Sequence, residues 1–119
     1  MSQTLFIDDQ QSWDRVAEAL ASEPLLALDT ESNSLHAYRE KVCLIQISAG
    51  EDIFLLDPLA VADLSALGNL LANPSIIIVA HGSDYDVRCL HRDYGFTIRS
   101  LFDTELAARL LGIPRTNLS

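Results

Sequence analysis

Apolar residues recur along the chain at two spacings, one typical of helices and the other typical of strands. Steps of three and four residues predict helices at residues 12–22, 64–71, 83–94 and 103–111. Apolar runs between turn-forming residues predict strands at residues 25–28, 42–47, 53–56, 76–79 and 98–102. The chain also has a short apolar start at residues 5–7.

The order of these segments predicts a mixed sheet. Residues 49–52 have the composition of a hairpin turn, so the first three strands are expected to be antiparallel. The later strands alternate with helices and are therefore expected to run parallel. The run at residues 76–79 lacks alternation, which is typical of a strand covered on both faces. We expect a single α/β domain over residues 1–119, with helices on both faces of the sheet.

Composition limits the function classes. The chain has 119 residues with 8 basic and 17 acidic side chains, a formal net charge of −9. This acidity argues against a nucleic-acid partner, because phosphate binding normally needs a basic surface. No signal peptide or long apolar run is visible, so we expect a cytoplasmic protein without membrane contact. Cys43 and Cys89 lie in apolar runs and are expected to be buried thiols.

Two carboxylates, Asp29 and Glu31, follow the first predicted strand. Residues i and i+2 of an extended chain point to the same side, so both can face one point at the sheet edge. Oxygen ligands of this kind suit Mg²⁺. A second Asp-x-Glu at residues 103–105 opens a predicted helix, where the two acids do not share a face. We therefore expect Asp103 to be a helix N-cap and the first pair to be candidate metal ligands.

A further acidic segment, from His81 to Asp86, leaves the most apolar strand and enters a helix. Two interpretations of it stay open. Ser83 and Asp86 have the spacing of a capping box, and an acid in the first turn favours the helix dipole. Alternatively, Asp86 leans over the sheet and adds a third carboxylate to the first pair. His81 is equally open, either as a hydrogen-bonded core residue or as a substrate contact.

Several longer stretches carry a resemblance. They include Leu-Ala-Leu-Asp-Thr-Glu-Ser at residues 26–32 and His-Gly-Ser-Asp-Tyr-Asp at residues 81–86. The others are residues 35–48, 56–59, 92–95 and 101–104. Together, in order and at the right spacing over nearly the whole chain, they resemble ribonuclease D and the DEDD-type 3′–5′ exonucleases, which have a ribonuclease H-like fold.

The resemblance implies a hydrolase that removes nucleotides from the 3′ end of RNA, with DNA as a less favoured substrate, by two-metal-ion catalysis. It implies that Asp29, Glu31 and Asp86 are the catalytic ligands of two Mg²⁺ or Mn²⁺ ions. Asp29 would bridge both ions, Glu31 would hold the ion that activates water, and Asp86 would hold the other. The expected substrate contacts are Thr30, His81 and Tyr85.

The fourth carboxylate of this family belongs to a Tyr-x-x-x-Asp motif, which the 119 residues do not contain. We therefore expect an incomplete exonuclease domain, without the C-terminal part that would carry the fourth Asp. Such a chain is expected to have little or no activity alone. Missing helices would also leave an apolar sheet face or edge uncovered, and we expect self-association there.

Two other classes fit part of the sequence. An exonuclease-like domain that binds nucleic acid or a partner without cleavage would retain the same three carboxylates. A response-regulator receiver domain is also acidic and of similar length, and Asp57 could serve as its phosphoacceptor. That class needs a lysine after a late strand, and the only lysine is Lys41.

Overall fold

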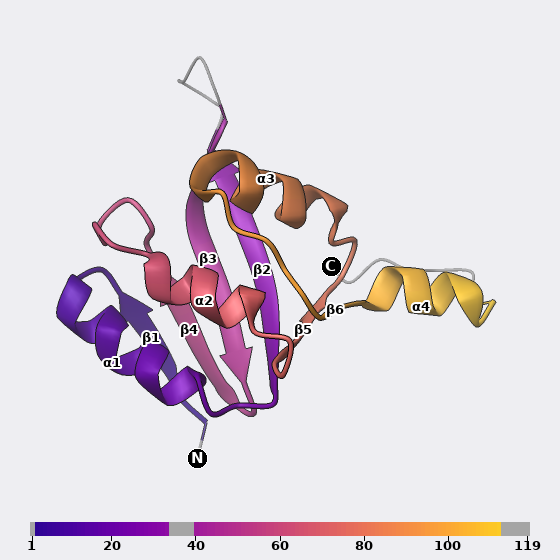
Figure 1. Cartoon of the computed structure of the whole chain (residues 1–119), viewed down its shortest axis with the longest axis horizontal. Coiled ribbons are helices and arrows are strands. Elements are labelled where there is room, and N and C mark those ends of the chain that lie inside the picture. Colours follow the sequence, from indigo (N-terminus) through magenta and orange to yellow (C-terminus); the bar gives the residue numbers. More distant parts are fainter. Residues whose placement is uncertain (1, 34–39, 113–119) are drawn as a thin grey trace.

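A six-stranded sheet organises the computed structural model, which describes residues 2–33 and 40–112 (Figure 1). The strands are β1 (Thr4–Ile7), β2 (Leu25–Asn33), β3 (Lys41–Ala49), β4 (Asp52–Leu56), β5 (Ile77–Ala80) and β6 (Leu101–Asp103). The helices are α1 (Gln10–Leu20), α2 (Ser65–Ala72), α3 (Asp84–Tyr94) and α4 (Thr104–Leu110). The strand order across the sheet is β1-β4-β3-β2-β5-β6.

The pairing of the strands confirms the predicted mixed sheet. β2, β3 and β4 are antiparallel neighbours, whereas β5 runs parallel to β2 and β6 runs parallel to β5. The short apolar start, which the periodicity did not define as a strand, forms β1 and pairs in parallel with β4. An antiparallel centre is incompatible with the strand–helix alternation of a receiver domain, so that alternative is wrong.

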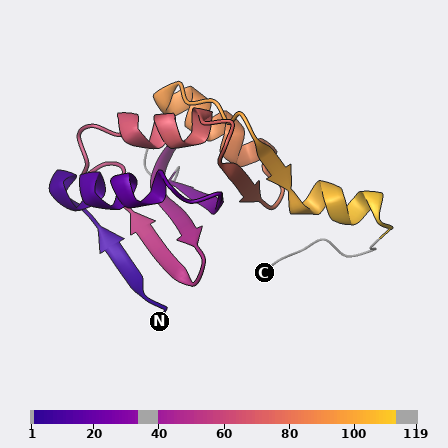
Figure 2. The same ribbon diagram turned by 60° about the horizontal axis from the view of Figure 1, so that its bottom comes forward.

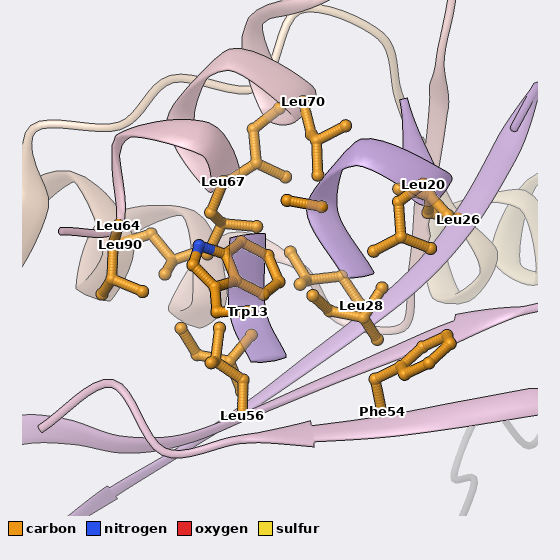
Figure 3. Close-up of a cluster of buried hydrophobic side chains, with 14 of the residues drawn as sticks. Trp13, Leu20, Leu26, Leu28, Phe54, Leu56, Leu64, Leu67, Leu70 and Leu90 are labelled. Atoms are coloured by element: carbon orange, nitrogen blue, oxygen red, sulfur yellow. The ribbon is translucent and has the colours of Figure 1, made fainter. Parts of the chain in front are cut away.

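One hydrophobic core lies between the sheet and helices α1, α2 and α3 (Figure 2). Trp13 of α1 is fully buried there, in one cluster with Leu56 of β4, Leu67 of α2 and Leu90 of α3 (Figure 3). These side chains come from the positions that the helical and strand spacings marked as apolar. The core therefore holds α3, and with it the segment from His81 to Asp86, against the sheet.

The opposite face of the sheet carries no helix within residues 2–33 and 40–112 (Figure 2). Ile77 of β5 is 45% exposed although Ile76 and Ile78 are buried, and Phe6 and Leu25 are exposed as well. The expectation of helices on both faces is therefore not met in this part of the chain. An unbroken apolar run identifies a strand with two apolar faces, but it does not show that both faces are covered.

Two helix ends show how the local sequence sets the borders. α1 begins at Gln10 rather than at residue 12, because the Asp9 carboxylate accepts a 2.7 Å hydrogen bond from the Ser12 amide. α3 ends at Tyr94 and is closed by Gly95, whose φ of 72° is the left-handed conformation expected of a residue that follows a helix.

Helix α4 extends from the edge of the sheet, away from the other three helices (Figures 1 and 2). None of its residues is buried, and its apolar Leu106 and Leu110 are exposed. Asp103 caps it by accepting hydrogen bonds from the amides of Glu105 and Leu106, which confirms the predicted N-cap. Among the described residues, every helix is too short or too polar to cross a bilayer.

Candidate functional site

Asp29 and Glu31 lie on β2, in the middle of the sheet, and both are exposed. β5 pairs with β2 only as far as Ala27, so both acids lie beyond the end of that neighbour. Thr30, between them, points to the opposite side and is buried. The alternation of a strand thus gives the two acids a common face, as their spacing predicted.

Asp86 lies in the first turn of α3 and is buried beside β2. Its carboxylate accepts a 2.5 Å hydrogen bond from the Thr30 hydroxyl. Ser83 makes no capping bond, since its hydroxyl donates instead to Asp103 at 2.8 Å. The capping-box interpretation of this segment is therefore wrong, and Asp86 does lean toward the strand that carries Asp29 and Glu31.

The electrostatics of Asp86 link it to the acid on β2. Burial raises the pKa of Asp86, and the negative charge of Asp29 raises it further, against the lowering effect of the Thr30 hydrogen bond. The two carboxylates are therefore close enough to repel each other. A cation bound between them would offset both the burial and the repulsion, and their oxygen donors are those that Mg²⁺ and Mn²⁺ prefer.

The three predicted ligands are not all brought together by direct contacts. The Glu31 side chain makes no hydrogen bond or ion pair with any described residue. Within residues 2–33 and 40–112, no three acidic, histidine or cysteine side chains are grouped as a metal site. Asp29 and Asp86 fit a metal site by charge and donor type, whereas Glu31 shares only the face of Asp29.

A hollow of about 270 Å³ adjoins Asp29 between β2 and β5. Its lining includes Asp29, His81 and Thr104. The His81 ring is half-buried, with Nδ1 2.9 Å from the Thr104 hydroxyl and Nε2 3.7 Å from a Glu105 carboxylate oxygen. His81 is therefore held in place by the start of α4, and its ring borders the space next to Asp29.

Asp103 ties the loop before α3 to the start of α4, a role that its spacing did not predict. Besides the two capping bonds, its carboxylate accepts hydrogen bonds from the amides of Gly82 at 3.0 Å and Ser83 at 2.8 Å. Burial raises the pKa of Asp103, but the hydrogen bonds from Ser83, Leu106 and Gly82 outweigh it, and the pKa lies well below its usual range. A carboxylate so fully occupied is a structural group, as the sequence analysis expected.

Tyr85, next to Asp86, makes contacts that sequence reasoning missed. Its hydroxyl donates to the Glu40 carboxylate, and this hydrogen bond raises the pKa of Tyr85 to about 12. Glu40 also lies 3.7 Å from a guanidinium nitrogen of Arg92. Glu40 directly precedes β3, and no local pattern links it to α3; residues 34–39 lie outside the described residues.

The sequence of the chain identifies its family. Residues 5–119 match the family model of a 3′–5′ exonuclease. The chain therefore belongs to this 3′–5′ exonuclease family, and the predicted resemblance to ribonuclease D is confirmed.

Individual relatives agree. The chain is 38% identical over 114 residues to an exosome complex component 10 homolog of Caenorhabditis elegans, covering 95% of this chain and 13% of the relative. It is 35% identical over 108 residues to a ribonuclease D of Shewanella sp., covering 91% of this chain and 28% of the relative. It thus spans well under a third of each of these two curated relatives.

Solved structures match the fold closely. The catalytic core of RRP6 from Trypanosoma brucei has a TM-score of 0.90 and 31% identity, covering 96% of this chain and 32% of that one. Escherichia coli RNase D, described as an exoribonuclease involved in structured RNA processing, has a TM-score of 0.87 and 31% identity. That match covers 94% of this chain and 30% of the other. The α/β exonuclease fold expected from the sequence is thereby confirmed.

Proposed function

We propose that this chain forms the metal-binding part of a 3′–5′ exonuclease that hydrolyses phosphodiester bonds at the 3′ end of RNA. The observation that carries the proposal is the buried Asp86 carboxylate, held on β2 by Thr30 and within electrostatic range of Asp29. It occurs in a chain whose residues 5–119 match a 3′–5′ exonuclease family.

Asp29, Glu31 and Asp86 would hold two divalent ions, Mg²⁺ or Mn²⁺. When bound, the ions would activate a water molecule and stabilise the departing 3′ oxygen. The protein's own contribution is positional. The Thr30 hydroxyl orients Asp86, and the hollow beside Asp29 offers room for the end of the substrate, next to His81.

The net charge of −9 is compatible with this function. Two divalent ions add four positive charges at a site formed by three carboxylates, and bound cations are often the largest local charges. RNA is the favoured substrate because relatives include ribonuclease D and an RNase D structure described as an exoribonuclease. The fourth carboxylate of the motif Tyr-x-x-x-Asp is absent from these 119 residues, so the isolated chain is expected to cleave weakly or not at all.

Metal titration tests the proposal. Mn²⁺ binding is measured by calorimetry for the wild-type chain, Asp29→Asn, Asp86→Asn and the control Asp14→Asn, an exposed acid on α1. We expect the first two substitutions to abolish binding and the control to retain it. Equal binding by all four proteins, or no binding by the wild type, would contradict the proposed site.

A catalytically inactive binding module is the second candidate. Two observations favour the binding module. Among the described residues, Glu31 is not grouped with two other potential metal ligands, and the sequence contains no Tyr-x-x-x-Asp. This candidate predicts that the chain binds RNA without trimming a 5′-labelled oligonucleotide in Mn²⁺. Strong EDTA-sensitive trimming that is lost in Asp29→Asn would exclude this candidate.

We also propose that the chain self-associates through the open face of its sheet. Phe6, Leu25, Ile77 and Phe102 are exposed there or at its edge, and exposed apolar surface favours association. Light scattering at increasing protein concentration is expected to show a rising mass. A constant monomer mass at high concentration would refute the idea.

A further inference from the structure

The cations of this acidic chain are unevenly distributed. The sequence has eight lysine and arginine residues, of which Arg39 and Arg115 lie outside the described part. Four of the remaining six line two hollows beside α3. One hollow, of about 300 Å³, is lined by Lys41, Arg92, Glu40 and Asp93. The lining of the other, of about 400 Å³, includes Tyr85 and Arg88 of α3, Arg109 of α4, and the carboxylates of Asp84, Asp103 and Glu105.

Tyr85, Arg88 and Arg92 are spaced i, i+3 and i+7 along α3 and therefore share one face of the helix. We call these three residues, together with Arg109, the α3 stripe. Along the helix it extends for roughly 10 Å, and it begins at Tyr85, the residue before Asp86. Tyr85 and Asp86 both lie in the first turn of α3, so the stripe starts within one helical turn of the proposed metal site.

The groups of the stripe are accessible. The Arg88 side chain is 72% exposed and that of Arg109 is 66% exposed, and Tyr85 is 38% exposed. Arg88 pairs with Asp84 at 3.7 Å and Arg109 pairs with Glu105 at 2.5 Å. Exposed ion pairs contribute little to stability, so a phosphate can replace either carboxylate at low cost. Arg92 donates two hydrogen bonds to the Asp93 carboxylate, which makes it the least available of the three arginines.

We propose that the α3 stripe binds the single-stranded RNA segment that precedes the 3′ end, with phosphates on Arg88 and Arg109 and a base on the Tyr85 ring. An aromatic ring between cationic side chains is the combination that single-strand binding surfaces use. Two of the three carboxylates in the hollow beside Arg88 and Arg109 already pair with these arginines, so phosphate binding there requires the arginines to leave those exposed ion pairs. This inference rests on the proposed function, because it places the 3′ end at Asp86.

The test uses the 119-residue chain in EDTA, so that no divalent ion is bound and no RNA is cleaved. Binding of a 5′-fluorescein 12-nucleotide oligouridylate is followed by anisotropy at several salt concentrations. The double variant Arg88→Ala/Arg109→Ala is compared with Arg15→Ala/Arg99→Ala, which removes the same charge from exposed positions outside the stripe. We expect the first pair to weaken binding roughly tenfold and to lower the salt slope by about 1.4, or about 0.7 for each phosphate that is no longer neutralised. The second pair should stay within about twofold of the wild type.

Tyr85 gives an independent measurement. Tyr85→Phe, which keeps the ring, should bind within about twofold of the wild type, and Tyr85→Ala should weaken binding about fivefold or more. Equal losses in the two arginine pairs, an unchanged salt slope, or equal binding of a 12-residue polyglutamate peptide would overturn the α3 stripe. Failure of the metal titration would instead count against the catalytic site and leave this measurement interpretable, because it contains no metal.

Discussion

Replacing Asp103 tests how strongly one carboxylate holds the loop before α3 to the start of α4. In Asp103→Ala, the amides of Glu105 and Leu106 lose their cap, and the amides of Gly82 and Ser83 lose their acceptor. An N-cap substitution of this type costs about 1 kcal/mol. Each hydrogen bond to a charged group contributes roughly 1.5 kcal/mol or more. The cap and the two further hydrogen bonds together give about 4 kcal/mol, which we reduce to about 3 kcal/mol because Asp103 is only partly buried.

The assay is urea denaturation at pH 7, followed by circular dichroism. With an m value of roughly 1.5 kcal/mol/M, a loss of about 3 kcal/mol lowers the midpoint by about 2 M. Asp9→Ala is the matched control, because Asp9 caps α1 through the Ser12 amide alone. Its midpoint should fall much less.

The pH dependence has a defined sign. The pKa of Asp103 is lowered in the folded state from its ordinary value of 3.8. The contribution of the charged Asp103 to the free energy of unfolding is therefore complete above pH 3.8. It is lost as the pH falls below 3.8 toward the folded-state pKa. The difference between wild type and Asp103→Ala should therefore be equal at pH 7 and pH 5 and smaller at pH 3. A midpoint shift no larger than that of Asp9→Ala, or a difference that grows in acid, would refute the reasoning.

Three further substitutions have defined outcomes. Asp86→Asn should raise the thermal midpoint of the metal-free chain by a few degrees at pH 7, because the raised pKa of Asp86 means that its charged form destabilises the fold. The gain in thermal midpoint should vanish below pH 3.8. A thermal midpoint below that of the wild type at pH 7 would contradict this. Trp13→Ala should lower the free energy of unfolding in urea by about 3–5 kcal/mol. Trp13→Phe should cost much less, because the buried indole N–H has no hydrogen-bond partner among the described residues. Equal losses for the two variants would contradict this. Gly82→Ala should cost about 1–2 kcal/mol, because Gly82 has a φ of 59° and an added Cβ would lie 2.7 Å from a Glu105 carboxylate oxygen; an unchanged urea midpoint would contradict it.

The sequence was most informative where one periodic pattern determines one feature. The spacing of Trp13, Ala17 and Leu20 located α1, and the hairpin turn before Asp52 set the antiparallel centre of the sheet. The pair Asp29 and Glu31 could be given a common face because a strand alternates with a period of two. Such features depend on neighbours within a few residues.

Features that depend on contacts between residues distant in sequence were harder to predict. The hydrogen bond from Thr30 to Asp86 joins residues 56 positions apart, and that from Tyr85 to Glu40 joins residues 45 apart. The capping-box pattern at Ser83 was locally valid, but Asp103 competes for the same hydroxyl from another part of the fold. The covering of the sheet also depends on where helices pack, which the apolar run at residues 76–79 does not encode.

The protruding α4 has a consequence for the dynamics of the backbone. Its last turn buries no side chain, whereas its first turn is fastened to the loop before α3 by Asp103. Amide protons near Leu110 should therefore exchange with deuterium through local fraying, while those of Glu105 and Leu106 exchange only when the Asp103 hydrogen bonds open. The boundary between ordered and fraying backbone thus falls inside a single short helix, one turn away from the hollow beside Asp29.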